Sequence, residues 1–287
     1  MNDKALKKMF NSSQWPLIDF SLAEVSQQAQ KLAGKLSISG IQPKLSVKLD
    51  KKQNLLIPVA EGGEYILKPQ TNTFPCIPEN EQCCMDIAEQ LAIDIPPHCL
   101  IPLKDHSLAY VIRRFDREKG IKIHQEDFTQ ILGKKDKYNG SAEQIGRRLK
   151  EISVAPGYDA QLFFERVVLN FILGNGDAHL KNYSVSHRDG ENIRLTPAYD
   201  IVCSKIVIPV EEDSAISING KKDKLRKKDF EELADYLDIP PKVRYEKFEK
   251  KYDIVKQIIE SSRIIGENQR QFTAIVKKRI CRLELSE

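Results

Sequence analysis

The chain has 287 residues, which is enough to bury a large core in one two-lobed unit or in two small domains. Its composition, 41% hydrophobic and 30% charged, is that of a globular protein and excludes a disordered or fibrous chain. No apolar run approaches the roughly 20 residues that span a bilayer, and no apolar segment follows the charged N-terminus. We therefore expect neither membrane insertion nor secretion. The formal net charge of +4 is too small to indicate a partner by itself.

The six cysteines are not arranged as the spaced pairs of a zinc site, and Cys83 and Cys84 are adjacent in a helix-like stretch. Together with the absence of an export signal, this usage indicates reduced thiols with mostly structural roles. It predicts a cytoplasmic location.

The first third of the chain is rich in predicted strands. Alternation of apolar and polar residues predicts the strands, and apolar positions three and four residues apart predict the helices. In chain order we expect a helix at 22–34, strands at 45–49 and 64–68, a helix at 79–92, and strands at 99–103 and 108–114. The second helix is stopped by Pro96 and Pro97.

Beyond Asp116 the pattern becomes helical. Helices are expected at 142–153, 159–173, 228–238 and 243–285, with only short strands around 183–195. A strand-rich first part followed by a helical remainder predicts an α+β protein with two lobes. We place these lobes at residues 1–115 and 116–287.

Two segments in the second lobe carry the residues expected to do chemistry. Residues 174–182 read Gly-Asn-Gly-Asp-Ala-His-Leu-Lys-Asn, and residues 196–200 read Thr-Pro-Ala-Tyr-Asp. In phosphoryl transfer, one carboxylate accepts the proton of the attacking hydroxyl, and an amide with a second carboxylate binds magnesium. Asp177, Asn182 and Asp200 fit these three roles. The alternative is that both segments are ordinary surface turns, where such residues are common.

Two further side chains lie inside the first segment. His179 either stabilises negative charge on the transferred group or shapes the loop through hydrogen bonds. Lys181 either neutralises charge on the γ-phosphate or faces solvent. The apolar helix that precedes them is expected to deliver the loop and to have no chemical role.

The strand-rich lobe is expected to hold the nucleotide. Lys68 ends a predicted strand and is expected to contact the α- and β-phosphates of ATP. Glu81, in the first turns of the next helix, is expected to pair with Lys68, and Glu79 is the rival for that role. Phe115 follows the last strand of this lobe, and it either contacts the adenine ring or belongs to the core.

A serine-rich segment lies just before the first strand, where a phosphate-covering loop is expected. Residues 37–44 read Ser-Ile-Ser-Gly-Ile-Gln-Pro-Lys. With Gly40 as its one glycine, the segment is neither a Walker A loop nor a Gly-x-Gly-x-x-Gly motif. Ser37, Ser39 and Gly40 are the residues expected beside the phosphates, and both serines are candidate phosphate acceptors. The alternative is a plain serine-rich turn.

Taken together, these residues give the chain a resemblance to the HipA family of bacterial serine/threonine kinases, from about residue 35 to 240. The matching segments come in the family's order: the phosphate loop at 37–44, the nucleotide-lysine strand at 65–68, the helix start at 79–81, the inter-lobe hinge at 114–117, the Gln-Glu-Asp element at 124–127, the catalytic loop at 176–182 and the magnesium motif at 195–200. Arg113 departs from the glutamate that family members often have at the hinge, so the adenine contact of this position stays open.

The resemblance implies a protein-kinase-like fold, ATP and Mg²⁺ as cofactors, serine/threonine kinase activity and a role as the toxin of a toxin–antitoxin system. Because 36 residues precede the phosphate loop, the chain resembles the short HipT type of a HipBST-like system. The implied partners are a separate small antitoxin similar to the missing N-terminal subdomain and a helix-turn-helix DNA-binding antitoxin. The implied substrate is an aminoacyl-tRNA synthetase, whose phosphorylation inhibits translation. Ser37 and Ser39 are the implied autophosphorylation sites, where the added negative charge repels ATP.

Two other functions stay open. A small-molecule phosphotransferase shares the two-carboxylate chemistry but transfers phosphate to a metabolite. A non-catalytic component of a DNA-bound antitoxin complex would use the basic run at residues 221–228, where six of the eight residues are basic. The same run is otherwise a solvated loop. DNA contact through a partner is compatible with the kinase interpretation.

Overall fold

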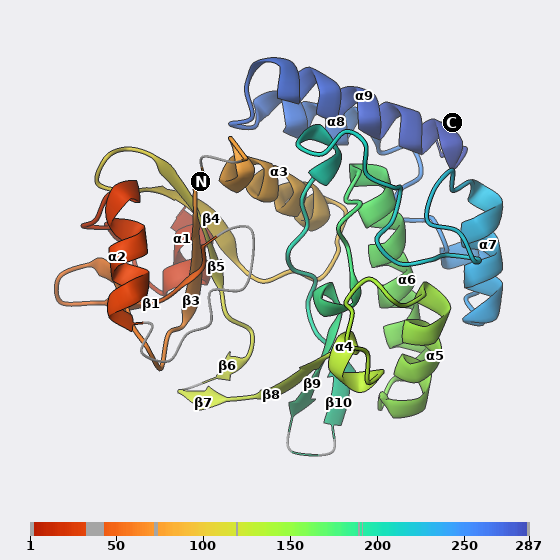
Figure 1. Cartoon of the computed structure of the whole chain (residues 1–287), viewed down its shortest axis with the longest axis horizontal. Helices are drawn as coiled ribbons and strands as arrows, with labels where there is room; N and C mark the ends of the chain where they lie inside the picture. Colours follow the sequence, from red (N-terminus) through yellow and green to blue (C-terminus); the bar gives the residue numbers. More distant parts are fainter. Residues whose placement is uncertain are drawn as a thin grey trace. The chain divides into compact units, whose positions relative to one another are not determined.

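The computed structural model describes residues 3–32, 43–71, 74–118, 120–188, 190 and 192–285. The chain forms two compact units that are not continuous in sequence. The first unit comprises Met1–Gln82 with Pro96–Ile121, and the second comprises Cys83–Ile95 with Lys122–Glu287. Figure 1 shows the elements of both units in the colours of the sequence. The lobe boundary expected between residues 115 and 116 stays a prediction.

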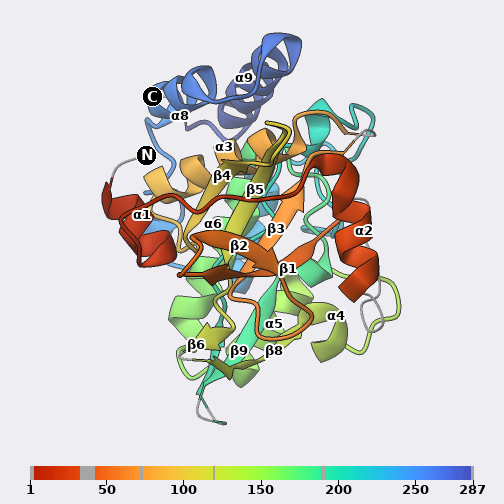
Figure 2. The same cartoon turned by 90° about the vertical axis from the view of Figure 1, so that its left-hand side faces the viewer.

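The first unit is built on a five-stranded antiparallel sheet with the order β2-β1-β3-β5-β4. Its strands are β1 (Leu45–Asp50), β2 (Leu55–Pro58), β3 (Tyr65–Pro69), β4 (His98–Pro102) and β5 (Leu108–Arg113). The four strands expected from apolar–polar alternation are thereby confirmed to within one or two residues. The edge strand β2 was not expected from the sequence. Figure 2 turns this sheet toward the viewer.

Two helices complete the core of the first unit. Helix α1 (Asp3–Phe10) places Leu6, Met9 and Phe10 on one face, and all three side chains are buried. Helix α2 (Leu22–Leu32) agrees with the helix expected from residue 22 and buries Val25 in the same cluster. The ring of Phe10 lies 5.2 Å from that of Tyr65 in β3, measured between centroids. The core therefore joins the helices to the middle of the sheet.

Helix α3 (Ile77–Gln90) begins in the first unit and ends in the second. Cys83, Cys84, Ile87 and Ala88 are fully buried, which is the amphipathic face expected for a helix at 79–92. All six cysteines lie in the described part of the chain, and none of them forms a disulfide. Burial raises the pKa of the Cys83 thiol to about 12, as expected of a structural, unreactive cysteine.

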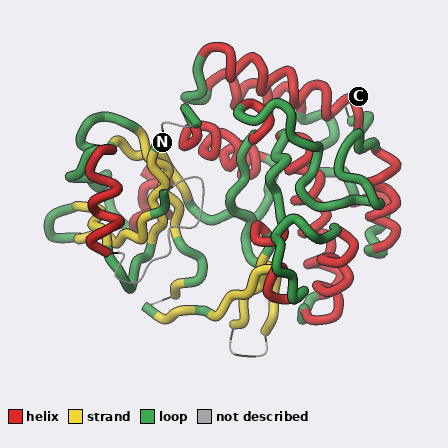
Figure 3. The backbone as a smooth tube through the Cα atoms, viewed as in Figure 1, coloured by secondary structure: helices red, strands yellow, loops and turns green. Residues whose placement is uncertain are grey.

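The second unit is mainly helical, as Figure 3 shows by its colours. Helix α6 (Pro156–Leu173) contacts α5 (Ala142–Ile152), α7 (Lys227–Tyr236) and α9 (Gly266–Arg282), and α8 (Tyr252–Ser261) packs on α9. Phe163, Phe164, Val168 and Leu169 of α6 are fully buried or nearly so, which explains why its sequence is apolar on most sides.

The helical pattern expected at 243–285 is wrong as a continuous element. Helix α8 ends at Ser261, and the Ser262 hydroxyl accepts a hydrogen bond from the Ile264 backbone. Gly266, with φ of 64°, starts α9 from a left-handed conformation that glycine adopts without strain. The preceding residues form a short helical turn at Pro241–Val243 and a loop up to α8.

A three-stranded antiparallel sheet with the order β10-β9-β8 flanks the helices of the second unit. Its strands are β8 (His124–Asp127), β9 (Ser184–Arg188) and β10 (Asn192–Leu195), which confirms the short strands expected around 183–195. The Asp127 side chain caps the short helix α4 (Phe128–Ile131) that follows β8. Two further short strands pair with each other, β6 (Arg117–Glu118) and β7 (Ile121–Lys122).

Sheet and helices are thus segregated along the chain, and the expected α+β class is confirmed. Among the described helices, none combines the length and the apolar composition that crossing a membrane requires.

Candidate active site

Two glycines permit the backbone path of the loop that follows α6. Gly174 ends the helix with φ of 71°, and its N–H bonds back to the carbonyls of Asn170 and Phe171. Gly176 allows a close approach, because a Cβ there would lie 2.6 Å from both the Glu211 carboxylate carbon and the Glu212 carbonyl oxygen. The Gly176 N–H donates to the Ser204 hydroxyl at 2.8 Å. The turn therefore fits only a residue without a side chain at position 176.

A buried polar chain ties both ends of this loop to α6. The Asn175 amide donates to Asn170 Oδ1 at 2.8 Å, and the Asn170 amide donates to the Tyr183 hydroxyl at 3.2 Å. Burial raises the pKa of Tyr183 to about 12, so its hydroxyl stays protonated at neutral pH. Asn175 and Tyr183 are thereby both bonded to Asn170 of α6. The motif residues 177–182 lie in the loop between these two anchored positions.

Asp177 is half-buried in this loop and meets a hydroxyl group. The Tyr138 hydroxyl donates to Asp177 Oδ1 at 2.8 Å. Burial and this bond to a carboxylate raise the pKa of Tyr138 to about 12, so the phenol remains a donor. Tyr138 was not expected in the site from the sequence. The Asp177 carboxylate is therefore placed to accept a hydrogen bond from an O–H group.

The His179 side chain is buried and bonded within the protein. Its Nε2 lies 2.8 Å from the Lys137 ammonium, and the ring is buried. Burial lowers its pKa, assisted by the positive charge of Lys137 and opposed by Asp177 and Asp200. A neutral ring accepts from Lys137 through Nε2 and then has its proton on Nδ1. The backbone of Lys137 is also bound, since its carbonyl accepts from the Leu180 N–H at 3.1 Å.

Asn182 closes the short helical turn Leu180–Asn182. Its Oδ1 accepts from the His179 N–H at 3.0 Å, and its own N–H donates to the His179 carbonyl at 2.9 Å. An amide oxygen has two lone pairs, so one remains available for a cation. The Lys181 side chain between them is exposed, and its carbonyl accepts from the Tyr199 hydroxyl at 3.0 Å.

Asp200 ends the second segment in a left-handed conformation, with φ of 55°. Such a conformation is strained for most residues and tolerated by aspartate, and it is often found at functional sites. The negative charges of Asp177 and Asp200 both oppose the lowering of the His179 pKa. Carboxylate and amide oxygens are the hard ligands that Mg²⁺ prefers, and Asn182 with Asp200 fits this donor set.

A buried arginine positions the segment that ends at Asp200. Arg166 of α6 donates to the Thr196 carbonyl, and burial lowers the pKa of this guanidinium to about 10. The Ala198 N–H also donates to the Asp94 carbonyl at 2.8 Å. Arg166 could not be predicted as a positioning residue, because its partner lies 30 residues away in the chain.

In the first unit, Lys68 and Glu81 form a buried ion pair. Lys68 Nζ lies 2.5 Å from Glu81 Oε1, and the two side chains are 4% and 2% exposed. Glu81, the partner expected first, is thus paired with Lys68 in the structure. The ammonium also lies 5.6 Å from the centre of the Tyr110 ring. Phe115 follows β5 and is half-buried.

The expected site residues divide between the two units. Asp177, His179, Lys181, Asn182 and Asp200 all belong to the second unit, whereas Lys68, Glu81 and Phe115 belong to the first. Ser37, Ser39 and Gly40 lie outside the described residues. The joint site of the two groups stays a prediction.

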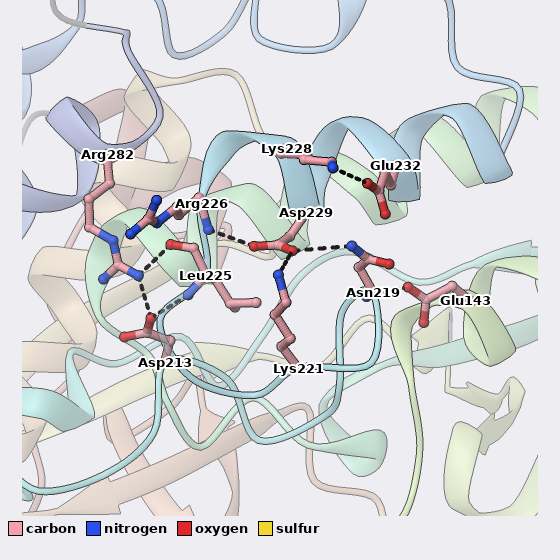
Figure 4. A network of polar contacts seen from close by, with 10 residues as sticks. All are labelled: Glu143, Asp213, Asn219, Lys221, Leu225, Arg226, Lys228, Asp229, Glu232 and Arg282. Carbon is pink, nitrogen blue, oxygen red and sulfur yellow. Dashed lines mark hydrogen bonds and ion pairs between the residues drawn. The ribbon is translucent and has the colours of Figure 1, made fainter.

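Two lysines of the basic run at residues 221–228 form ion pairs with acidic side chains, and Figure 4 shows both pairs. Lys221 lies 2.6 Å from Asp229, and Lys228 lies 3.6 Å from Glu232. It also borders a cavity of about 830 Å³ whose lining includes eight lysine and arginine side chains and three acidic ones. The basic lining residues are Lys205, Lys224, Arg226, Lys227, Lys228, Lys278, Arg279 and Arg282. The basic run therefore contributes to the lining of a positively charged cavity.

Comparison with known proteins decides the family. Residues 36–272 match the HipA-like C-terminal domain. The chain belongs to this family. A Sinorhizobium fredii protein named "Putative kinase Y4dM" is 35% identical over 215 residues, which are 68% of this chain and 51% of that protein. The serine/threonine-protein kinase toxin HipA of Shewanella oneidensis is 25% identical over 214 residues, 66% of this chain and 48% of the toxin. The chain spans about half the length of the curated relatives it matches.

Two solved structures share the fold of this chain. A complex of Shewanella oneidensis HipA with HipB and operator DNA contains a chain that matches with a TM-score of 0.72 and 20% identity, covering 94% of this chain and 72% of that one. The Helicobacter pylori proinflammatory kinase CtkA matches with a TM-score of 0.57 and 15% identity, covering 94% and 97%. The expected kinase-like fold class is thereby confirmed.

Proposed function

We propose that the chain is an ATP- and Mg²⁺-dependent kinase that phosphorylates serine or threonine hydroxyls of a protein. The observation that supports this most is the hydrogen bond from the Tyr138 hydroxyl to Asp177, because it puts an O–H donor against the carboxylate expected to act as the base. A substrate hydroxyl bound in the same direction would donate to the same oxygen. Membership of the HipA-like family and the kinase names of the relatives support the same reaction.

The roles follow from the chemistry of each side chain. Asp177 accepts the proton of the substrate hydroxyl as its oxygen attacks the γ-phosphorus and the bond to the β–γ bridging oxygen breaks. Asn182 and Asp200 would hold Mg²⁺, which neutralises charge on the phosphates. Lys68, oriented by Glu81, would contact the α- and β-phosphates. His179 and Lys137 shape the loop through their mutual hydrogen bond.

Label transfer tests this proposal. The purified chain is incubated with γ-labelled ATP, Mg²⁺ and a cell lysate, and phosphoserine and phosphothreonine are mapped by mass spectrometry. We expect label on protein with the wild type and none with Asp177→Asn. The control Asp253→Asn, an exposed aspartate on α8, should behave as the wild type. Label on a metabolite alone would favour a small-molecule phosphotransferase, and equal transfer by Asp177→Asn would refute the assignment of the base.

The biological role is the second part of the proposal. We infer a toxin of a HipBST-like system that inhibits translation by phosphorylating an aminoacyl-tRNA synthetase and that autophosphorylates at Ser37 or Ser39. The relatives named as HipA toxin and the HipA–HipB–DNA complex support a toxin with an antitoxin partner. The lysate experiment tests the substrate, since the labelled protein is identified directly, and label on Ser37 or Ser39 tests autophosphorylation.

The basic cavity supports contact with a polyanion such as DNA, either directly or inside an antitoxin complex. Its eight basic side chains give a local excess of positive charge over the three acidic ones. Affinity for duplex DNA should fall with salt, and Lys227→Gln with Lys228→Gln should weaken it and reduce the salt dependence. Unchanged affinity in that double variant would leave any DNA contact to the partner alone.

A further inference from the structure

Three potential metal ligands gather on one face of the small sheet in the second unit. His124 and Glu126 lie on β8, two residues apart, so their side chains point to the same face. His187 on β9 is the direct cross-strand partner of His124 in the antiparallel register. This arrangement comes from strand pairing, and its three residues are not those to which the Mg²⁺ role is assigned.

The ligand atoms converge. His187 Nε2 lies 2.8 Å from Glu126 Oε2, and His124 Nε2 lies 3.7 Å from the same oxygen. One ligand atom from each of the three residues lies within 4.8 Å of the others. Around a tetrahedral Zn²⁺, with bonds of about 2.0–2.2 Å, ligand atoms are about 3.4 Å apart. Small side-chain rotations are enough to bring all three to one ion.

The contact between His187 and Glu126 is close, yet it is not a hydrogen bond of good geometry. Nε2 of His187 is shielded from water and has no hydrogen-bond partner among the described residues, although the Glu126 oxygen is 2.8 Å away. The nitrogen and the oxygen are therefore close to each other without a hydrogen bond between them. A cation at that point would satisfy the nitrogen and the oxygen together, which a direct hydrogen bond in this geometry does not.

Exposure increases across the cluster and leaves a path for an ion. The His187 side chain is 18% exposed, that of Glu126 is 36%, and that of His124 is 66%. Imidazole nitrogens favour Zn²⁺ and other borderline transition metals, whereas Mg²⁺ prefers an all-oxygen site. Three protein ligands leave a fourth position for water.

We propose that His124, Glu126 and His187 bind a divalent transition-metal ion of the Zn²⁺ class. The bound ion cross-links β8 to β9, and β9 begins two residues after Asn182, directly beyond the loop that contains Asp177. The ion thus stabilises the strand that follows this loop. The proposal does not depend on the kinase function.

Metal titration tests the site. The purified, metal-stripped chain is titrated with Co²⁺, whose visible spectrum reports its ligands, and Zn²⁺ then competes for the same site. We expect one strong equivalent, without the intense near-ultraviolet band that cysteine thiolates give. His187→Gln and, separately, the mostly exposed His124→Gln should weaken Zn²⁺ affinity by about 100-fold or more, since loss of even a group that only hydrogen-bonds to a metal ligand costs about 10–100-fold.

The control is His106→Asn, an exposed histidine in a left-handed turn that asparagine tolerates. It should bind metal as the wild type does, and far-ultraviolet circular dichroism should show that all variants are folded. Zn²⁺ should also raise the Tm of the wild type and of His106→Asn, but not that of His124→Gln. Wild-type binding by both His124→Gln and His187→Gln, thiolate bands in the Co²⁺ spectrum, or no binding at all would overturn the proposal.

Discussion

The candidate site residues of the two units differ in their burial and in their partners. In the first unit, Lys68 and Glu81 are almost fully buried and paired with each other at 2.5 Å. In the second, Asp177 is half-buried and is bound by a phenol rather than by a cation. Burial holds a side chain in one geometry, which a ligand-binding group requires. Partial exposure instead leaves a side chain accessible to a substrate. Substitutions in the two places should therefore affect different quantities.

The largest effect is expected on turnover from Asp177→Asn. Positioned general bases contribute about 10²–10⁴-fold to rate, and the amide cannot accept the proton. Because Asp177 has no buried ionic partner among the described residues, the Tm should change little. Steady-state kinetics of phosphoryl transfer, beside thermal unfolding, would measure both. A variant that unfolds instead would make Asp177 a structural residue and remove the contrast between the units.

Lys68→Met should have the opposite profile, with a large loss of stability. Removing one member of a buried ion pair takes the nearest opposite charge from the other member and costs about 3–5 kcal/mol. Urea unfolding measures this loss, and nucleotide affinity should fall as well. The double variant Lys68→Met with Glu81→Leu should recover part of the stability, because neither charge of the pair is left. A single variant as stable as the wild type would show that the pair is open to water.

Alkaline pH should destabilise the first unit through Tyr65. Burial raises the pKa of this phenol from its ordinary value of 10.0 to about 12. A raised pKa means that the unfolded chain loses its proton first, so the stability contributed by Tyr65 is intact below pH 10 and is lost as pH rises toward about 12. Unfolding free energies at pH 9 and 11 should differ by less in Tyr65→Phe than in the wild type, by up to about 1.4 kcal/mol. Equal differences would exclude Tyr65 as the cause.

Tyr138→Phe should have the smallest effect and tests whether the phenol competes with substrate. Loss of one hydrogen bond changes free energies by about 1 kcal/mol, which is about fivefold in an equilibrium constant. We expect KM for the protein substrate to fall by about that factor, with kcat unchanged, since Asp177 no longer has to release the phenol. A drop in kcat would instead give Tyr138 a role in positioning the carboxylate.

The sequence was informative where neighbours along the chain determine the structure. Alternation of apolar and polar residues was enough to predict β1, β3, β4 and β5, because each strand buries one face. The pairing of Lys68 with Glu81 could also be predicted, since the lysine lies near the end of a strand and the glutamate lies in the first turns of the helix that follows it. Both inferences need only local geometry.

Contacts between distant segments could not be predicted. Tyr138 and Asp177 are 39 residues apart, and Lys137 and His179 are 42 apart, so no spacing rule relates them. The register that sets His124 opposite His187 is likewise a property of the folded sheet. The break between α8 and α9 was missed because apolar residues continue on both sides of it.

The most direct test of the whole site is a crystal structure of the chain with Mg²⁺ and a non-hydrolysable ATP analogue. We expect Lys68 against the α- and β-phosphates, Asn182 and Asp200 on the metal, and Asp177 facing open space beyond the γ-phosphate. A nucleotide bound elsewhere, or one whose metal touches neither Asn182 nor Asp200, would contradict the proposed chemistry.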